Sequence, residues 1–261
     1  MSLHPGAWLV WALCSGLAAM VTTNPFYLLP LAAVAWVVYA ARRTPGPALR
    51  SFRVFVTFGV VALATRTVLV LFGPVTSGSV VLAALEGLRL AVLLMVFGTF
   101  NSVADPYRML KLAPRRVHEP ALAAALALSI APRYIEAVAR VKEAQRMRGI
   151  EVRRWRSLPA LTVPVLETGM EEALSLAESM DARGHGRGPR SRYRPERFGP
   201  ASWATALVSG SALVGFVALE RGGADLVMAA LPLRWPEVSW AHLGAILLLA
   251  LPAFVTEGRP E

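Results

Sequence analysis

The chain has 261 residues, of which 55% are hydrophobic, and its 27 basic and 17 acidic side chains give a formal net charge of +10. This combination is typical of a membrane protein whose basic loops stay out of the lipid. Its single cysteine, Cys14, excludes an internal disulfide and a cysteine-cluster metal site, and the four histidines are scattered. We therefore expect no bound metal and no cofactor.

The first hundred residues predict four membrane spans, at residues 8–23, 26–41, 54–72 and 79–100. Asn24-Pro25 separates the first two, and because proline disfavours a continuous helix, the pair predicts a tight turn. These two spans are shorter than the ~20 residues that a crossing helix usually needs, so we expect a hairpin of short helices rather than a cleaved leader. The arginines of residues 42–53 place the loop before the third span in the cytoplasm by the positive-inside rule.

Three charged side chains fall inside these spans: Arg66 in the third, and Glu86 and Arg89 in the fourth. The spacing of three residues puts Glu86 and Arg89 on one helix face, so we expect them to form a structural ion pair. Arg66 is expected to extend to the membrane interface. Because intramembrane charges are also candidates for function, a polar transport site at these residues stays open as an alternative.

Residues 101–200 differ in character, with a net charge of +7 against +3 for the rest of the chain. A long charged segment between spans predicts a cytoplasmic module. Asp105-Pro106 predicts a helix start, with the carboxylate as cap and proline in the first turn. Pro132 and Pro164 are expected to interrupt the helical pattern, leaving helices at residues 133–148 and 165–182.

Each of these two helices ends in arginine followed by glycine. Glycine adopts the left-handed cap conformation without steric cost, and arginine interacts favourably with the negative end of the helix dipole. The pattern predicts two helix ends that each present an arginine and could fit into two sockets on a partner. The second helix also carries an apolar stripe, which we interpret as a packing surface. The residues concerned are Arg146, Met147, Arg148 and Gly149 at the first tip, Ala182, Arg183 and Gly184 at the second, and Leu166, Met170, Leu174, Ala177 and Met180 in the stripe.

An arginine-rich segment at residues 184–195 follows the second tip. It could bind nucleic acid, with Tyr193 available to stack on a base. A juxtamembrane loop beside anionic lipid headgroups is favoured, because a further span begins near Trp203. Spans at 203–219 and 240–255 complete the chain. The sequence thus predicts an all-α, polytopic membrane protein of about six short spans, divided into a membrane block at 1–100, a coupling region at 101–200 and a membrane block at 201–261.

The order of these motifs resembles the transmembrane T component of energy-coupling factor (ECF) transporters, a family of membrane scaffolds for vitamin and metal-ion uptake. The resemblance covers nearly the whole chain, and its one departure at the tips is Met147, where the family usually has alanine. Four stretches carry it: Asn24-Pro25-Phe26-Tyr27-Leu28, Asn101-Ser102-Val103-Ala104-Asp105-Pro106-Tyr107-Arg108-Met109-Leu110, Glu143-Ala144-Gln145-Arg146-Met147-Arg148-Gly149 and Ser179-Met180-Asp181-Ala182-Arg183-Gly184.

The resemblance implies a non-catalytic subunit in a prokaryotic inner membrane, with the coupling region in the cytoplasm. In the family, each tip docks into one of two cytoplasmic ATP-binding cassette (ABC) ATPase subunits, and their motion releases the substrate of a separate substrate-binding membrane (S) subunit. The docking residues would be Arg146, Arg148, Gly149, Ala182, Arg183 and Gly184. Neither Lys111 nor Lys142 follows a glycine, as a Gly-x4-Gly-Lys-Ser/Thr phosphate-binding loop requires, so ATP hydrolysis is expected in the partners.

Two other classes of function remain open from the sequence. The chain could be a stand-alone secondary transporter, which would need a polar site at Arg66, Glu86 and Arg89. It could instead be a membrane-anchored basic adaptor that binds lipid or nucleic acid through its arginine-rich segment. Transport without ATP would favour the first, and a steep salt dependence of nucleic-acid binding would favour the second. The sequence does not name the transported substrate, which in the ECF family is selected mainly by the S subunit.

Overall fold

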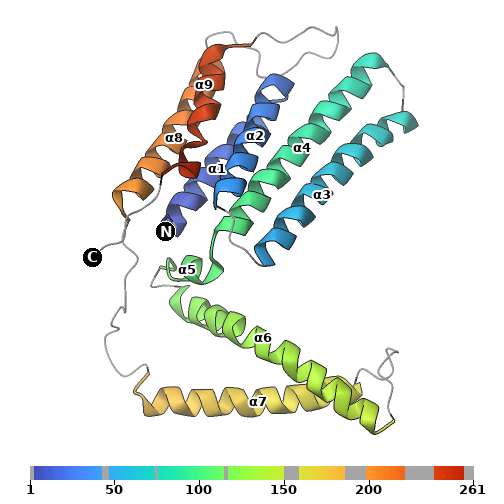
Figure 1. Ribbon diagram of the computed structural model, residues 1–261, viewed down its shortest axis with the longest axis vertical. Helices are drawn as coiled ribbons and strands as arrows, with labels where there is room; N and C mark the ends of the chain where they lie inside the picture. Colours follow the sequence, from blue (N-terminus) through green and yellow to red (C-terminus); the bar gives the residue numbers. More distant parts are fainter. Residues whose placement is uncertain are drawn as a thin grey trace. The chain divides into compact units, whose positions relative to one another are not determined.

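The computed structural model describes residues 3–42, 47–73, 76–114, 117–149, 159–185, 198–220 and 238–255, and the regular structure in these ranges is helical throughout (Figure 1). Five of its helices are long and apolar enough to cross a membrane. The prediction of an all-α polytopic membrane protein is confirmed. The chain forms two compact units, one of Met1–Leu112 with Glu196–Glu261 and one of Ala113–Pro195. The two predicted membrane blocks therefore fall within a single unit.

The helices of the first unit follow the predicted spans closely up to the last one. The apolar segment expected as a span at 240–255 forms a short helix followed by a separate 3₁₀ turn. The residues expected to join the last two spans lie mostly outside the described residues. The elements are α1 (Pro5–Val21), α2 (Pro25–Arg42), α3 (Pro47–Leu69), η1 (Val70–Phe72), α4 (Ser77–Val103), α5 (Pro106–Leu110), α8 (Pro200–Glu220), α9 (Trp240–Leu248) and η4 (Leu251–Ala253).

Two predicted local structures are confirmed in the first unit. At the α1–α2 turn, the Asn24 side chain accepts a hydrogen bond from the backbone N–H of Phe26 at 3.0 Å, which fixes the start of α2 at Pro25. At the start of α5, the Asp105 carboxylate accepts from the N–H of Tyr107 at 2.9 Å. Both are side-chain caps that satisfy an N–H which the first turn of a helix leaves without a partner.

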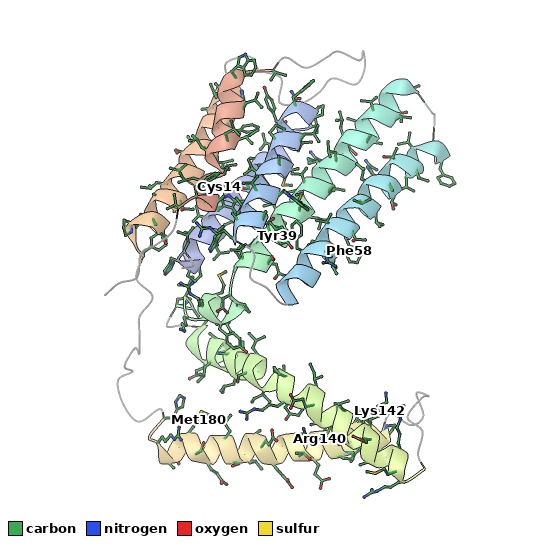
Figure 2. All side chains as sticks on the ribbon, in the orientation of Figure 1. Cys14, Tyr39, Phe58, Arg140, Lys142 and Met180 are labelled. Carbon is green, nitrogen blue, oxygen red and sulfur yellow. The ribbon has the colours of Figure 1, made fainter. Side chains whose placement is uncertain are left out.

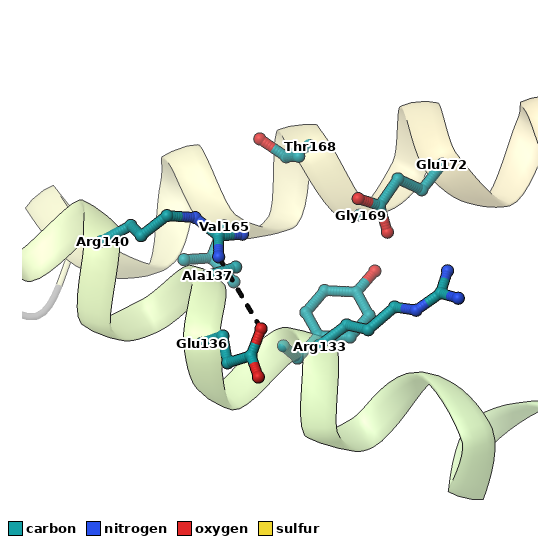
Figure 3. A pocket seen from close by; sticks show the side chains of 9 residues that line it. Arg133, Glu136, Ala137, Arg140, Val165, Thr168, Gly169 and Glu172 are labelled. Atoms are coloured by element: carbon teal, nitrogen blue, oxygen red, sulfur yellow. Dashed lines mark ion pairs between the residues drawn. The ribbon is translucent and has the colours of Figure 1, made fainter.

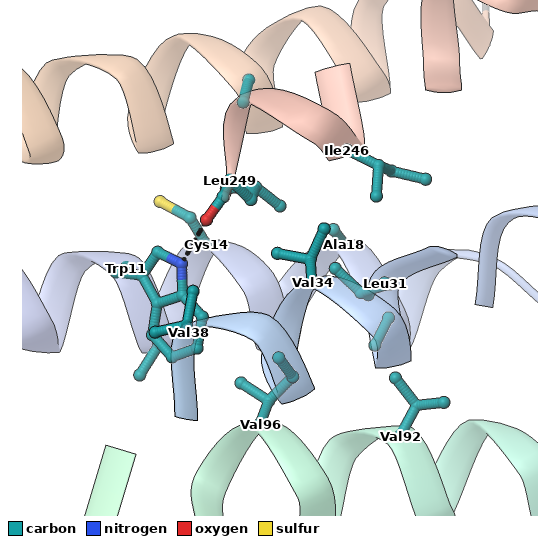
Figure 4. Close-up of a cluster of buried hydrophobic side chains, with 14 of the residues drawn as sticks. Trp11, Cys14, Ala18, Leu31, Val34, Val38, Val92, Val96, Ile246 and Leu249 are labelled. Atoms are coloured by element: carbon teal, nitrogen blue, oxygen red, sulfur yellow. Dashed lines mark hydrogen bonds between the residues drawn. The ribbon is translucent and has the colours of Figure 1, made fainter. Parts of the chain in front are cut away.

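The core of the first unit explains how the irregular C-terminal segment is held. Trp11 is fully buried, and its indole Nε1 donates to the carbonyl of Leu249 at 2.8 Å, just after α9 ends (Figure 4). Arg42 donates from Nε to the carbonyl of Pro252 at 2.8 Å and from a second nitrogen to that of Val255. In lipid, backbone carbonyls outside a helix must find donors within the protein. Trp11 and Arg42 supply them.

The α3–α4 pair depends on close approach at glycines. A Cβ added to Gly87 would lie 2.9 Å from the Cα of Leu63, and one added to Gly59 would lie 3.1 Å from the Cα of Ala91. Small residues that bring two backbones together are a general basis for helix association in membranes, where burial of apolar surface contributes little. The packing of α3 on α4 is thus specified by residues that carry no side chain.

We predict that Gly87→Ala destabilises the protein, because the new methyl group would meet the backbone of α3. Overpacking of this kind costs about 1–3 kcal/mol. The control is Gly210→Ala in α8, where an added Cβ meets nothing within 4 Å. That change should be neutral or stabilising by up to about 1 kcal/mol through helix propensity. Thermal unfolding in detergent compares the two, and equal midpoints would contradict the proposed role of the close approach.

The second unit contains two long helices, α6 (His118–Met147) and α7 (Pro159–Ala182). The expected breaks at Pro132 and Pro164 are wrong, because both prolines lie inside continuous helices. Proline removes one N–H donor from a helix, and the remaining hydrogen bonds on either side can maintain the helix through it. Glu119–Met147 in α6 also meets the length and hydropathy of a membrane span.

Candidate functional site

The second arginine tip ends α7 in a complete glycine cap. The N–H of Gly184 donates to the carbonyl of Asp181 at 2.8 Å, and that of His185 donates to the carbonyl of Met180 at 3.0 Å. Gly184 has φ +75°, in the left-handed region. These two bonds with a left-handed residue between them define a Schellman motif. Arg183 therefore occupies the position between the last helical residue and the capping glycine.

The first tip ends α6 in the same way. The N–H of Gly149 donates to the carbonyl of Arg146 at 3.0 Å, Gly149 has φ +76°, and Arg148 stands at the C-cap with φ −86° and ψ 9°. The residue that would complete the motif, Ile150, lies outside the described residues. Arg148 and Arg183 thus hold equivalent positions at the ends of two helices. The predicted left-handed conformation is confirmed at both glycines.

Both tips present their side chains to the outside. Met147 is 80% exposed, and Arg146, Arg148, Ala182 and Arg183 are also exposed. Within the described part of the chain, no ion pair or side-chain hydrogen bond is found for Arg148 or Arg183. A Cβ added to either capping glycine would meet nothing within 4 Å, so glycine is needed there for its backbone conformation rather than for space. Each tip is an exposed cation on a fixed backbone.

The apolar stripe of α7 does not pack as expected. Leu166, Met170 and Leu174 are 63%, 67% and 63% exposed, so the interpretation of the stripe as a packing surface is wrong. The residues of α7 that line the pocket against α6 are Val165, Thr168, Gly169 and Glu172, and none of them belongs to the stripe. The stripe therefore has no apolar surface within the described residues to cover it.

The crossing of α6 and α7 forms an open pocket of about 290 Å³ (Figure 3). On its rim Arg140 pairs with Glu136 of the same helix at 3.9 Å, and both side chains are largely exposed. An exposed pair of this kind contributes little to stability. Figure 2 shows Arg140 and Lys142 on α6 near this crossing, and Met180 on α7 well away from it. The lining residues are Arg133, Tyr134, Glu136, Ala137, Arg140, Val165, Thr168, Gly169 and Glu172.

The intramembrane charges pair differently from the prediction. Arg66 of α3 donates from Nε to Glu86 of α4 at 2.9 Å, and a second Arg66 nitrogen forms an ion pair with the same carboxylate oxygen. Arg89 instead approaches the carbonyl of Met20, at the end of α1, at 3.4 Å. The expected Glu86–Arg89 pair is therefore corrected to Arg66–Glu86. Glu86 pairs with Arg66 of the neighbouring helix rather than with Arg89 of its own helix, because α3 and α4 pack closely enough to bring Arg66 within reach of the carboxylate.

Neither group of residues has the composition of a metal centre. Among the described residues, no group of three or more histidine, cysteine, aspartate or glutamate side chains could hold a metal ion. The ion pair links α3 to α4 in the first unit, and the tips belong to the second. The exposed tips are the candidate functional site.

A family model for the cobalt transport protein family, CbiQ, matches residues 1–193. The chain belongs to this family. A search among curated proteins finds no match. The match includes the predicted spans of the first hundred residues and both arginine tips, so the resemblance proposed from the motifs is confirmed at the level of the family. Together with the apolar helices, it makes this CbiQ-family chain a membrane component of cobalt-type transport.

We predict that Gly184→Ala loosens the second tip, because a left-handed conformation costs an alanine about 1–2 kcal/mol. The N–H of His185, bonded to Met180, should then exchange with solvent about 5- to 30-fold faster. Gly184→Asn is the matched control and should have a smaller effect, since asparagine tolerates this conformation. Hydrogen exchange measures both. Equal protection in wild type and Gly184→Ala would contradict a cap that depends on glycine.

Proposed function

We propose that this CbiQ-family chain is the transmembrane coupling subunit of an ECF-type ABC uptake transporter. Its two arginine tips dock into sockets on two cytoplasmic ATPase subunits, one tip per subunit. The observation that carries the proposal is the equivalence of the tips: each places an exposed arginine between the end of a long helix and a left-handed glycine. A single such end would be unremarkable in a helical protein, whereas two suit a partner with two sockets.

Arginine at a fixed helix end is suited to docking. Its planar guanidinium forms bidentate hydrogen bonds with carboxylates or carbonyls, a geometry that lysine cannot reproduce. The backbone around Arg183 is held by the bonds of Gly184 and His185, so little further ordering is needed when the tip binds. Because the cap lowers the entropy cost of ordering the tip, a larger part of the arginine's interaction energy contributes to the binding free energy.

The rest of the mechanism assigns the energy and the substrate to partners. ATP hydrolysis in the ATPase subunits would move the tips, and α6 and α7 would transmit that motion to a separate S subunit that binds a vitamin or metal ion. Exposed apolar side chains on α3, including Val54, Phe58 and Val61, offer a surface that an S subunit or lipid can cover. On this proposal the protein lies in a prokaryotic plasma membrane with α6 and α7 on the cytoplasmic side.

We predict that Arg148→Ala with Arg183→Ala abolishes co-purification of the ATPase subunits from detergent-solubilised native membranes. Losing a charge-assisted hydrogen bond should cost about 1.5–3 kcal/mol per tip, so each single variant should bind about 10- to 150-fold more weakly. Membrane insertion should be unchanged, because both arginines are exposed. The matched control is Lys142→Ala, which removes an exposed cation of α6 away from the tip and should retain the ATPases.

Two results would count against this function. Wild-type transport by the double variant would show that the tips are not needed. A folded wild-type protein that retains no ATPase would favour a stand-alone transporter, for which transport in liposomes without ATP is the direct assay.

A further inference from the structure

The first half of α6 is apolar and is not buried within its own unit. Although a longer part of the helix meets the length and hydropathy of a span, its uncharged part is only residues 121–131, and none of these is buried. A bilayer crossing takes about 20 residues, whereas a shorter unburied apolar stretch is typical of a helix at a membrane surface. The first charged residue after this stretch is Arg133, which lines the pocket at the α6–α7 crossing. The pocket therefore begins where the apolar surface of α6 ends.

The pocket carries charges of both signs, and two of them are not paired. Arg140 pairs with Glu136 at 3.9 Å at one end, and Arg133 and Glu172 lie on facing helices at the other end (Figure 3). In the described part of the chain, neither Arg133 nor Glu172 forms an ion pair or a side-chain hydrogen bond. A ligand that complements both of these side chains carries a negative group and a positive group.

Two hydroxyl groups also line the pocket. A Cβ added to Gly169 would lie 2.7 Å from Cζ of Tyr134 and closer still to its hydroxyl oxygen, so the absence of a side chain at 169 lets Tyr134 reach the wall formed by α7. Thr168 donates its hydroxyl to the carbonyl of Pro164 at 3.0 Å, which leaves the hydroxyl oxygen able to accept. Tyr134 can thus donate to an anionic group, and Thr168 can accept from a cationic one.

The charges of α7 select against a purely anionic ligand. Between Pro159 and Ala182 the helix has five acidic residues and no basic one. An anionic phospholipid would bring its net negative charge against these carboxylates, which is unfavourable. A zwitterion with a phosphate and a primary ammonium can place the phosphate at Arg133, whose planar guanidinium binds phosphate oxygens in pairs, and the ammonium at Glu172. A quaternary ammonium has no N–H and would leave that carboxylate without a hydrogen bond.

The size of the pocket suits a headgroup rather than a whole lipid. Its volume of about 290 Å³ is near the lower end of the about 300–1,000 Å³ that is typical of small-ligand sites. Acyl chains attached to such a headgroup need an apolar surface next to the pocket. Residues 121–131 of α6 provide one.

We propose that this pocket binds the headgroup of an aminophospholipid, of which phosphatidylethanolamine is the simplest. Arg133 and Tyr134 bind the phosphate, Glu172 and Thr168 bind the primary ammonium, and residues 121–131 contact the acyl chains. The site holds the second unit at a bilayer surface through a specific lipid. It goes beyond the docking function and uses neither of the arginine tips.

The test is native mass spectrometry of the delipidated full-length protein in detergent. Phosphatidylethanolamine, phosphatidylcholine and phosphatidylglycerol with identical acyl chains are added at equal concentrations, and wild type should retain the first at least fivefold more than either of the others. Arg133→Gln and Glu172→Gln should each lower bound phosphatidylethanolamine at least fivefold, and Glu172→Gln should also raise bound phosphatidylglycerol. The matched controls are Lys142→Gln and Glu178→Gln, which remove an exposed charge of the same sign from the same helix outside the pocket and should match wild type.

A second arm separates a lipid from a soluble ligand with the same charges. Soluble O-phosphoethanolamine lacks the acyl chains and should displace bound phosphatidylethanolamine only at a concentration at least tenfold above that of the lipid. Leu128→Asn, in the apolar stretch, should weaken binding of the lipid and leave binding of O-phosphoethanolamine unchanged. Equal affinity for the lipid and for O-phosphoethanolamine would overturn the assignment to a lipid.

The site itself is overturned if the three lipids are retained equally, if Arg133→Gln and Glu172→Gln keep the wild-type preference, or if the controls lose as much lipid as these variants. None of these outcomes bears on the docking function, because the assay contains no ATPase. Conversely, a wild-type protein that retains no ATPase but selects phosphatidylethanolamine through Arg133 and Glu172 would leave the lipid site intact.

Discussion

The end of a helix leaves carbonyl groups without donors, and this constraint accounts for much of the structure. In the first unit, side chains from other helices supply the donors: Trp11 and Arg42 bond the carbonyls of the C-terminal segment, and Arg89 approaches the end of α1. At the two tips, backbone N–H groups just beyond the helix do so instead, through Gly149 and Gly184. The same chemical need is met in two ways.

That difference decides which arginines are available to a partner. Arg42 and Arg89 bond backbone carbonyls within the protein, and Arg66 pairs with Glu86. At the tips the backbone caps the helix, and the neighbouring guanidinium is exposed and has no side-chain hydrogen bond or ion pair with any described residue. The proposed function assigns docking to Arg148 and Arg183, although net charge alone would not distinguish them from the other arginines of this basic chain.

The sequence predicted the features that depend on near neighbours. The caps at Gly149 and Gly184, the Asp105 cap and the Asn24 turn each involve residues within a few positions of one another, and all four are as expected. It failed where the outcome depends on packing between helices. The partner of Glu86, the donors for the last segment, and the close contact of Tyr134 with Gly169 join residues at least 20 positions apart. The sequence also failed to predict that α6 and α7 continue through Pro132 and Pro164. A proline removes one backbone hydrogen bond from a helix but does not by itself end the helix.

The most direct test of the account is to identify what the tips touch in native membranes. A photo-crosslinking amino acid is placed at Met147 and at Ala182, beside the two arginines, with Leu207 on the exposed face of α8 as the reference position. The account predicts that both tip positions form adducts with an ABC ATPase subunit and that Leu207 does not. Adducts at the tips with lipid or with other proteins, and none with an ATPase, would contradict it.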